Sequence, residues 1–122
     1  MSESRTVVLL CTDLMMTSTV SRAVAECGLQ FCSLIATNQL TDTRDQDLIL
    51  IDLATPGLDI EHAAAALNEH QLKIAIIYGP HVHTERFEQA RAAGFRRVMA
   101  RGRFNTEITR IVQDFADVQQ IG

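Results

Sequence analysis

The segment from Leu48 to Leu53, with the sequence L-I-L-I-D-L, limits the possible folds of this chain more than any other segment. Four consecutive aliphatic residues leave no polar face, which is typical of a parallel strand covered on both sides of its sheet. Pro56 and Gly57 then favour a loop. The segment therefore predicts a buried strand that carries one carboxylate, Asp52, to the edge of a sheet.

Strand and helix signals alternate along the rest of the chain. The strands are expected at Thr6 to Cys11, Phe31 to Ala36, Asp47 to Leu53, Ile74 to Tyr78 and Val98 to Ala100. Apolar residues at helical spacing occur in 16–27, in the alanine-rich segment after Asp59, in 87–93, and in 105–118, where Val118 completes an apolar stripe. Asp59 and Asn105 stand where N-caps are expected. This alternation predicts a doubly wound α/β sandwich with a mostly parallel sheet.

The chain length and one short connection refine this prediction. At 122 residues the chain is expected to form one domain, residues 1–122, with a core from 6 to 118. Only ten residues, Thr37 to Gln46, separate the second and third strands. A parallel crossover usually needs a dozen or more, so the second helix is expected to be short or absent.

Charge is unevenly distributed along the sequence. Residues 42–69 contain seven acidic residues and one arginine, whereas residues 86–110 contain seven arginines and two glutamates. We interpret these segments as two solvated faces of opposite sign, with a partner surface as the alternative. Nucleic-acid binding by the arginine-rich last third is less favoured. The whole chain is acidic, and among those arginines only Phe95 and Phe104 could stack on bases.

Several residues that often carry chemistry have a simpler interpretation here. The three cysteines, Cys11, Cys27 and Cys32, lack C-x-x-C spacing and are interpreted as buried apolar residues. His81 and His83 are interpreted as solvated loop residues, and Met15 and Met16 as core residues. The polar start of the sequence and the lack of any membrane-length apolar run favour a cytoplasmic protein without a membrane partner.

In a doubly wound fold, the functional site lies outside the carboxyl ends of the strands. The sequence C-T-D-L-M-M after the first strand has no glycine, so neither a dinucleotide site nor a P-loop is expected. Asp13 and Asp52 are the only carboxylates expected near this edge. The residues expected there are Cys11, Thr12, Asp13, Asp52, Tyr78, Gly79 and Arg101.

These residues and their surroundings resemble the receiver domain of two-component response regulators, the CheY-like family. D-L-I-L-I-D-L-A-T-P-G-L-D is similar to the phosphoacceptor strand and loop of that family, and A-A-G-F-R-R-V-M-A-R-G-R-F is similar to its segment around the conserved lysine. The resemblance implies a flavodoxin-like, three-layer sandwich with strand order 2-1-3-4-5. It also implies that Asp52 is the candidate phosphoacceptor and that Arg101 stands in place of the lysine.

The sequence departs from the family where the metal and phosphoryl group would bind. Cys11 and Thr12 occupy the positions of the acidic pair that holds Mg²⁺, and Asp13 falls one position too late. Tyr78 is aligned with the serine or threonine that contacts the phosphoryl group. Asp52, alone or with Asp13, is therefore expected to bind Mg²⁺ weakly if at all. We further hypothesise a permanent salt bridge between Arg101 and Asp52.

These matches and departures predict a degenerate pseudo-receiver, not an enzyme, that acts as a phosphorylation-independent interaction module in phosphorelay signalling. The alternative is a working receiver that is phosphorylated inefficiently on Asp52. The partner, a histidine kinase or a downstream effector, is expected on the face made by the fourth helix, fifth strand and fifth helix, and a homodimer is a further possibility. Nucleic acid is not the expected partner.

Overall fold

The computed structural model describes the backbone of residues 5–121 and the side chains of residues 5–118. Its centre is a five-stranded parallel sheet in the order β2-β1-β3-β4-β5. The strands are β1 (Thr6–Leu10), β2 (Gln30–Leu34), β3 (Leu48–Asp52), β4 (Ile76–Gly79) and β5 (Arg97–Ala100). The helices are α1 (Leu14–Glu26), the 3₁₀ helix η1 (Thr37–Asp42), α2 (Ile60–Ala65), α3 (Glu69–Ile74), α4 (Thr84–Ala93) and α5 (Arg101–Ile121). The predicted fold class and strand order are confirmed.

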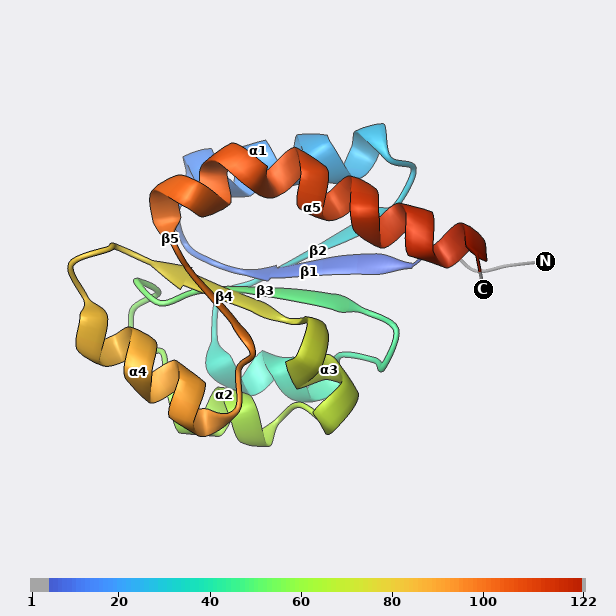
Figure 1. Cartoon of the computed structure of the whole chain (residues 1–122). Coiled ribbons are helices and arrows are strands. Elements are labelled where there is room, and N and C mark those ends of the chain that lie inside the picture. The colour runs from blue at the N-terminus through green and yellow to red at the C-terminus, as the bar shows by residue number, and fades with distance from the viewer. Residues whose placement is uncertain (1–4, 122) are drawn as a thin grey trace.

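Helices cover both faces of the sheet and make a three-layer sandwich (Figure 1). Helices α1 and α5 lie on one face, and α2, α3 and α4 lie on the other. Successive strand residues point to opposite faces, so Val7 and Leu9 pack in the core under α1 and α5, while Val8 and Leu10 pack in the core of the other face. Every residue of β3 is buried, as its aliphatic sequence predicts.

The register of the sheet determines which residues meet at its carboxyl edge. Asp52, the last residue of β3, is paired with Tyr78 of β4. Gly79 follows Tyr78, and a Cβ atom there would lie 2.9 Å from the Cβ of Leu53. The chains after β3 and β4 therefore approach so closely that position 79 has no room for a side chain.

Three helix boundaries differ from the sequence predictions. The alanine-rich segment forms two short helices, because the side chain of Asn68 accepts from the Gln71 amide and starts α3. Helix α3 then continues to Ile74, so β4 starts two residues later than predicted. Helix α5 starts at Arg101, directly after β5, and Asn105 lies inside it instead of capping it. The predicted cap at Asp59 is confirmed, since its side chain accepts from the His62 amide.

The second helix is short, as predicted, and is the 3₁₀ helix η1.

Several burial predictions were wrong. Cys32 is exposed because β2 is an edge strand, and Cys27 is only partly buried. Met15 is 82% exposed because it points away from the core at the start of α1, whereas Met16 is buried. Val118 is exposed near the end of α5.

Within residues 5–121, no helix is long and apolar enough to cross a membrane.

Candidate functional site

The carboxylate of Asp52 is buried at the end of β3, and both of its oxygens have hydrogen-bond donors. Only 3% of the residue is exposed. Oδ1 accepts from the backbone amide of Ala54 at 2.8 Å. Oδ2 lies 3.3 Å from the Sγ of Cys11, whose thiol donates to it. Donors of the protein therefore supply the hydrogen bonds that water would give to an exposed carboxylate.

Cys11 follows β1 and forms the other half of this contact. It is 2% exposed, and its sulfur also accepts from the Asp13 amide at 3.3 Å. Burial raises the pKa of the Cys11 thiol, and the neighbouring carboxylate of Asp52 raises it further. The thiol is thus protonated at neutral pH, so it serves as a hydrogen-bond donor and not as a nucleophile.

Tyr78 is fully buried on the side of the sheet that α1 and α5 cover. Its ring stacks on Phe104 of α5 with the centroids 3.9 Å apart and the planes 7° from parallel. Its hydroxyl lies beside Asp52 and Cys11, and burial together with these neighbours raises the pKa of Tyr78. The hydroxyl oxygen is buried without a hydrogen-bond partner of good geometry among the described residues. Tyr78 therefore extends the core toward Asp52 instead of presenting a hydroxyl to solvent.

Asp13 and Arg101 form an ion pair above this buried site. The Nη2 of Arg101, in the first turn of α5, donates to the Oδ2 of Asp13. The Oδ1 of Asp13 accepts from the amides of Met15 and Met16 at 2.9 and 3.2 Å and caps α1. The hypothesised salt bridge from Arg101 to Asp52 is wrong, because the exposed Arg101 pairs with Asp13, whereas Asp52 is buried and takes its hydrogen bonds from Cys11 and Ala54.

The residues predicted for this edge do come together, but they do not form a magnesium site. Mg²⁺ prefers oxygen ligands, and the side chain that donates to Asp52 is the thiol of Cys11. Both oxygens of Asp13 are engaged by the helix amides and by Arg101, and Thr12 is exposed. Among residues 5–118, no group of three His, Cys, Asp or Glu side chains is arranged to hold a metal ion. The donor set does not fit Mg²⁺.

The surface around the buried site carries exposed apolar side chains. Leu14 and Met15 start α1 and are 83% and 82% exposed, Ile35 follows β2, and Val82 follows β4. Next to Met15, a groove of about 550 Å³ lies between α1, the loop after β4 and the start of α5. His81 and Arg101 line it together with Met15. This carboxyl edge, containing Leu14, Met15, Ile35 and Val82, is referred to below as the apolar rim.

Several receiver domains of known structure match this chain over nearly its whole length. The receiver domain of the sensor histidine kinase PA1611 from Pseudomonas aeruginosa PAO1, which has a magnesium ion in its active-site cleft, matches with a TM-score of 0.71 and 18% identity over 94% of this chain and 99% of that chain. A response regulator receiver domain from Rhodospirillum rubrum matches with a TM-score of 0.67 and 12% identity over 92% and 94%. The beryllofluoride-activated NtrC4 receiver domain dimer matches with a TM-score of 0.64 and 16% identity over 91% and 98%.

No protein-family model matches the sequence, and no curated protein sequence matches it. The structural likeness extends over nearly the whole chain, at low identity. The chain therefore has the flavodoxin-like fold and, within that class, the CheY-like fold of response regulator receiver domains.

Three features of the site could not be read from the sequence. The Ala54 amide donates to Asp52 through loop geometry alone. Phe104 was interpreted only as an aromatic among arginines, and its stacking on Tyr78 depends on the early start of α5. The pair between Asp13 and Arg101 joins residues 88 positions apart. Asp13 as an N-cap did have a signal, since it stands directly before the first apolar residues of α1.

Replacing Tyr78 with phenylalanine tests whether its hydroxyl stabilises the fold. The ring and its stacking on Phe104 remain, while a buried oxygen without a well-placed partner is removed. Such a change is close to neutral or stabilising by up to about 1 kcal/mol. Urea unfolding should give an unchanged or higher free energy of unfolding. A loss of more than about 1 kcal/mol would show that the hydroxyl makes a strong hydrogen bond.

Two variants of Asp13 separate its roles as a helix cap and as an ion-pair partner. Asp13→Ala removes both and should lower the free energy of unfolding by about 1 kcal/mol or more. Asp13→Asn retains a capping oxygen and loses only a partly exposed ion pair, so it should cost about 0.5 kcal/mol. Equal losses in the two variants would mean that the cap contributes nothing.

The contribution of the Asp13 charge should also depend on pH. Its hydrogen bond from the Met16 amide, and then Arg101, hold the pKa of Asp13 below its ordinary value of 3.8. The stabilisation is therefore present above pH 3.8 and is lost as the pH falls through the lowered pKa. Unfolding curves of the wild type and Asp13→Asn should converge below pH 3.8. A gap that stays constant from pH 6 to pH 2 would contradict this assignment.

Proposed function

We propose that this chain is a pseudo-receiver, a cytoplasmic and non-enzymatic signalling module that binds a protein partner without being phosphorylated. The observation that supports it best is the environment of Asp52. Its two carboxylate oxygens take hydrogen bonds from Cys11 and Ala54 inside the protein. A phosphoacceptor uses those oxygens for attack and for metal binding, and a donor held against each oxygen competes with both.

The chemistry of phosphoryl transfer gives this observation its weight. Catalysis comes almost entirely from cations and donors placed around the transferred group. Here the acidic side chain nearest to the site, Asp13, is bound to Arg101 and to the start of α1. Arg101 is thereby held by a carboxylate on the surface. Neither a metal nor a free cation is positioned beside Asp52 by these residues.

The proposed partner surface is the face made by α4, β5 and α5. Arg91 and Arg96 are exposed there, and α5 adds two further arginines, each of which pairs with an acidic residue of the same helix. Arg103 lies 2.9 Å from Glu107, and Arg110 lies 4.0 Å from Asp114. Such exposed pairs are weak and can be exchanged for contacts with an acidic partner. A homodimer through this face would have to bring acidic residues of one copy opposite arginines of the other.

The apolar rim favours a second contact near the carboxyl edge. Leu14 and Met15 are exposed at the start of α1, and Met15 lines a groove together with Met16 and Pro80. Clusters of exposed apolar side chains on small proteins commonly mark interaction sites. A partner that covers this edge would lie over Asp52. Its binding would then depend on the residues around Asp52 and would need no covalent change of that residue.

The alternative function is a receiver that accepts phosphate inefficiently on Asp52. The observation that favours it is the place of Asp52 at the carboxyl end of the central strand β3, in a fold whose solved relatives are receiver domains. In that case the thiol of Cys11 would have to leave Oδ2 before each transfer. One experiment separates the two functions.

Incubating the protein with Mg²⁺ and acetyl phosphate, followed by intact-mass measurement, tests for transfer to Asp52. We expect no added phosphoryl group, because Cys11 and Thr12 offer Mg²⁺ no carboxylate beside Asp52 and both oxygens of Asp52 already accept hydrogen bonds inside the protein. A receiver domain that is known to be phosphorylated serves as the positive control. A stoichiometric adduct that disappears in Asp52→Asn, but persists in the surface control Asp59→Asn, would support the alternative and overturn the pseudo-receiver.

Replacing Cys11 with aspartate should create a magnesium site that the wild type lacks. A carboxylate at position 11 would face Asp52, repel it without metal and bind Mg²⁺ with it. Cys11→Asp should therefore be less stable than the wild type and should gain thermal stability in millimolar Mg²⁺.

Cys11→Asn is the matched control, because it has the same size without the charge. It should show no response to Mg²⁺, and neither should the wild type. Equal stabilisation of the wild type and Cys11→Asp by Mg²⁺ would show that the native side chains already bind the ion.

A further inference from the structure

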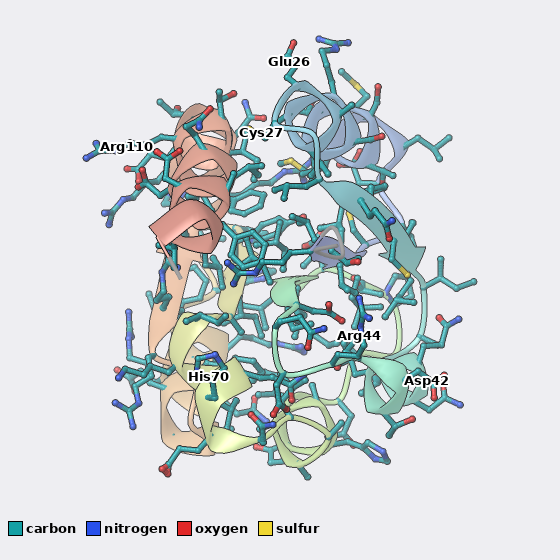
Figure 2. All side chains as sticks on the ribbon, turned by 90° about the vertical axis from the view of Figure 1, so that its right-hand side faces the viewer. Glu26, Cys27, Asp42, Arg44, His70 and Arg110 are labelled. Carbon is teal, nitrogen blue, oxygen red and sulfur yellow. The ribbon has the colours of Figure 1, made fainter. Side chains whose placement is uncertain are left out.

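A pocket of about 210 Å³ lies at the amino ends of the strands, at the opposite edge of the sheet from Asp52. Leu48 starts β3, Arg97 starts β5, and Arg5 directly precedes β1. Figure 2 looks onto this end of the molecule, with α5 and its Arg110 on one side and α3 and its His70 on the other. The pocket is therefore separate from the candidate phosphoacceptor site.

The walls of this pocket are the exposed margin of a hydrophobic core. Leu48, Ile111 and Phe115 belong to the core under α1 and α5, and Ile74 packs against it from the end of α3. An apolar cavity of about 150 Å³ is large enough for a benzene ring. The size and walls of the pocket thus suit a single aromatic ring.

Arg5 supplies a fixed positive charge at one side of the pocket. Its Cζ lies 3.8 Å from the centroid of the Phe115 ring. Its Nε donates to the carbonyl oxygen of Gln46 at 3.3 Å, and its Nη1 donates to that of Phe115 at 3.4 Å. A guanidinium has five N–H donors, so these contacts orient the group and leave donors for an anion.

Arg97 supplies the second positive charge. Its Nη1 donates to the carbonyl oxygen of Ile74 at 3.2 Å. Burial lowers the pKa of Arg97, and Asp114, on the rim of the pocket, acts against this effect. Burial likewise lowers the pKa of Arg5. Arg97 is exposed and Arg5 is partly buried, so both guanidinium groups are accessible to an anionic ligand.

The charges of the lining favour an anion over a cation. Arg5, Arg97 and His70 line the pocket with one carboxylate, Asp114, whose Oδ2 lies 4.0 Å from the Nε of the exposed Arg110. Asp47 also acts on Arg5 and Glu107 on Arg97, but Asp47 is paired with Arg44 and Glu107 with Arg103. Guanidinium groups bind carboxylates through two parallel hydrogen bonds. We propose that this pocket binds a small aromatic carboxylate, with its carboxylate on Arg5 and Arg97 and its ring against Leu48, Ile74 and Ile111. The inference does not rest on the proposed function.

Benzoate is the probe, and amide chemical shifts of the ¹⁵N-labelled full chain are the measurement. Saturable shifts of Ile74, Ile111 and Phe115, fitted by one site, are expected. Benzamide has the same ring without the charge and should bind at least about tenfold more weakly. Equal binding of benzamide would show that the pocket is merely apolar and would overturn the proposed carboxylate site. An absence of shifts at these amides in millimolar benzoate would also overturn the proposal.

Arg97→Gln removes one of the two charges and should weaken benzoate binding by about tenfold or more. Arg91→Gln is the matched control, because it removes an exposed arginine outside the pocket and should change the affinity less than about twofold. If Arg97→Gln gives a poorly dispersed spectrum, Arg5→Gln tests the same prediction. Unchanged affinity in the folded pocket variant would overturn the assignment.

Discussion

The structure depends on how one carboxylate is buried at the end of the central strand. Asp52 lies in a segment whose other residues are aliphatic, and every residue of β3 is covered. A buried charge without partners destabilises a fold severely. Here the Ala54 amide and the Cys11 thiol supply the partners, each through a loop that follows a strand. The thiol can donate because burial and the nearby carboxylate keep its pKa high.

The arrangement of the residues around Asp52 follows from these hydrogen bonds. With a thiol beside Asp52, the aromatic ring of Tyr78 can fill the space next to it and stack on Phe104. The early start of α5 that brings Phe104 there also places Arg101 beside the connection from β1 to α1, residues 11–13, where it pairs with Asp13. The charge of Asp13 at the surface is thus paired with Arg101, whereas the charge of Asp52 in the core is stabilised by other residues. The receiver domain of PA1611 has a magnesium ion in its active-site cleft, whereas in this chain the Asp52 carboxylate is in contact with the thiol of Cys11.

The sequence was sufficient to predict the layers and the sheet, because the aliphatic runs of β1, β3 and β4 and the glycine stops carry strong local signals. The strand order came from a family resemblance and is confirmed by the structure. Boundaries were harder to predict. Asn68 divides the alanine-rich segment, and α5 starts without a loop, where a cap at Asn105 was predicted. At the site, Cys11, Asp13, Asp52, Tyr78 and Arg101 were predicted to gather at one edge, and they do. Their pairing was predicted wrongly, because sequence alone does not show which of two carboxylates is buried.

The contact between Cys11 and Asp52 is tested most directly by a double-mutant cycle. Free energies of unfolding are measured for the wild type, Cys11→Ala, Asp52→Asn and the double variant at neutral pH. If the thiol donates to the carboxylate, the two changes are not additive, and the coupling energy should be about 1 kcal/mol. Additive losses, with a coupling energy near zero, would contradict the internal solvation of Asp52 and with it the reason for regarding the site as closed to phosphate.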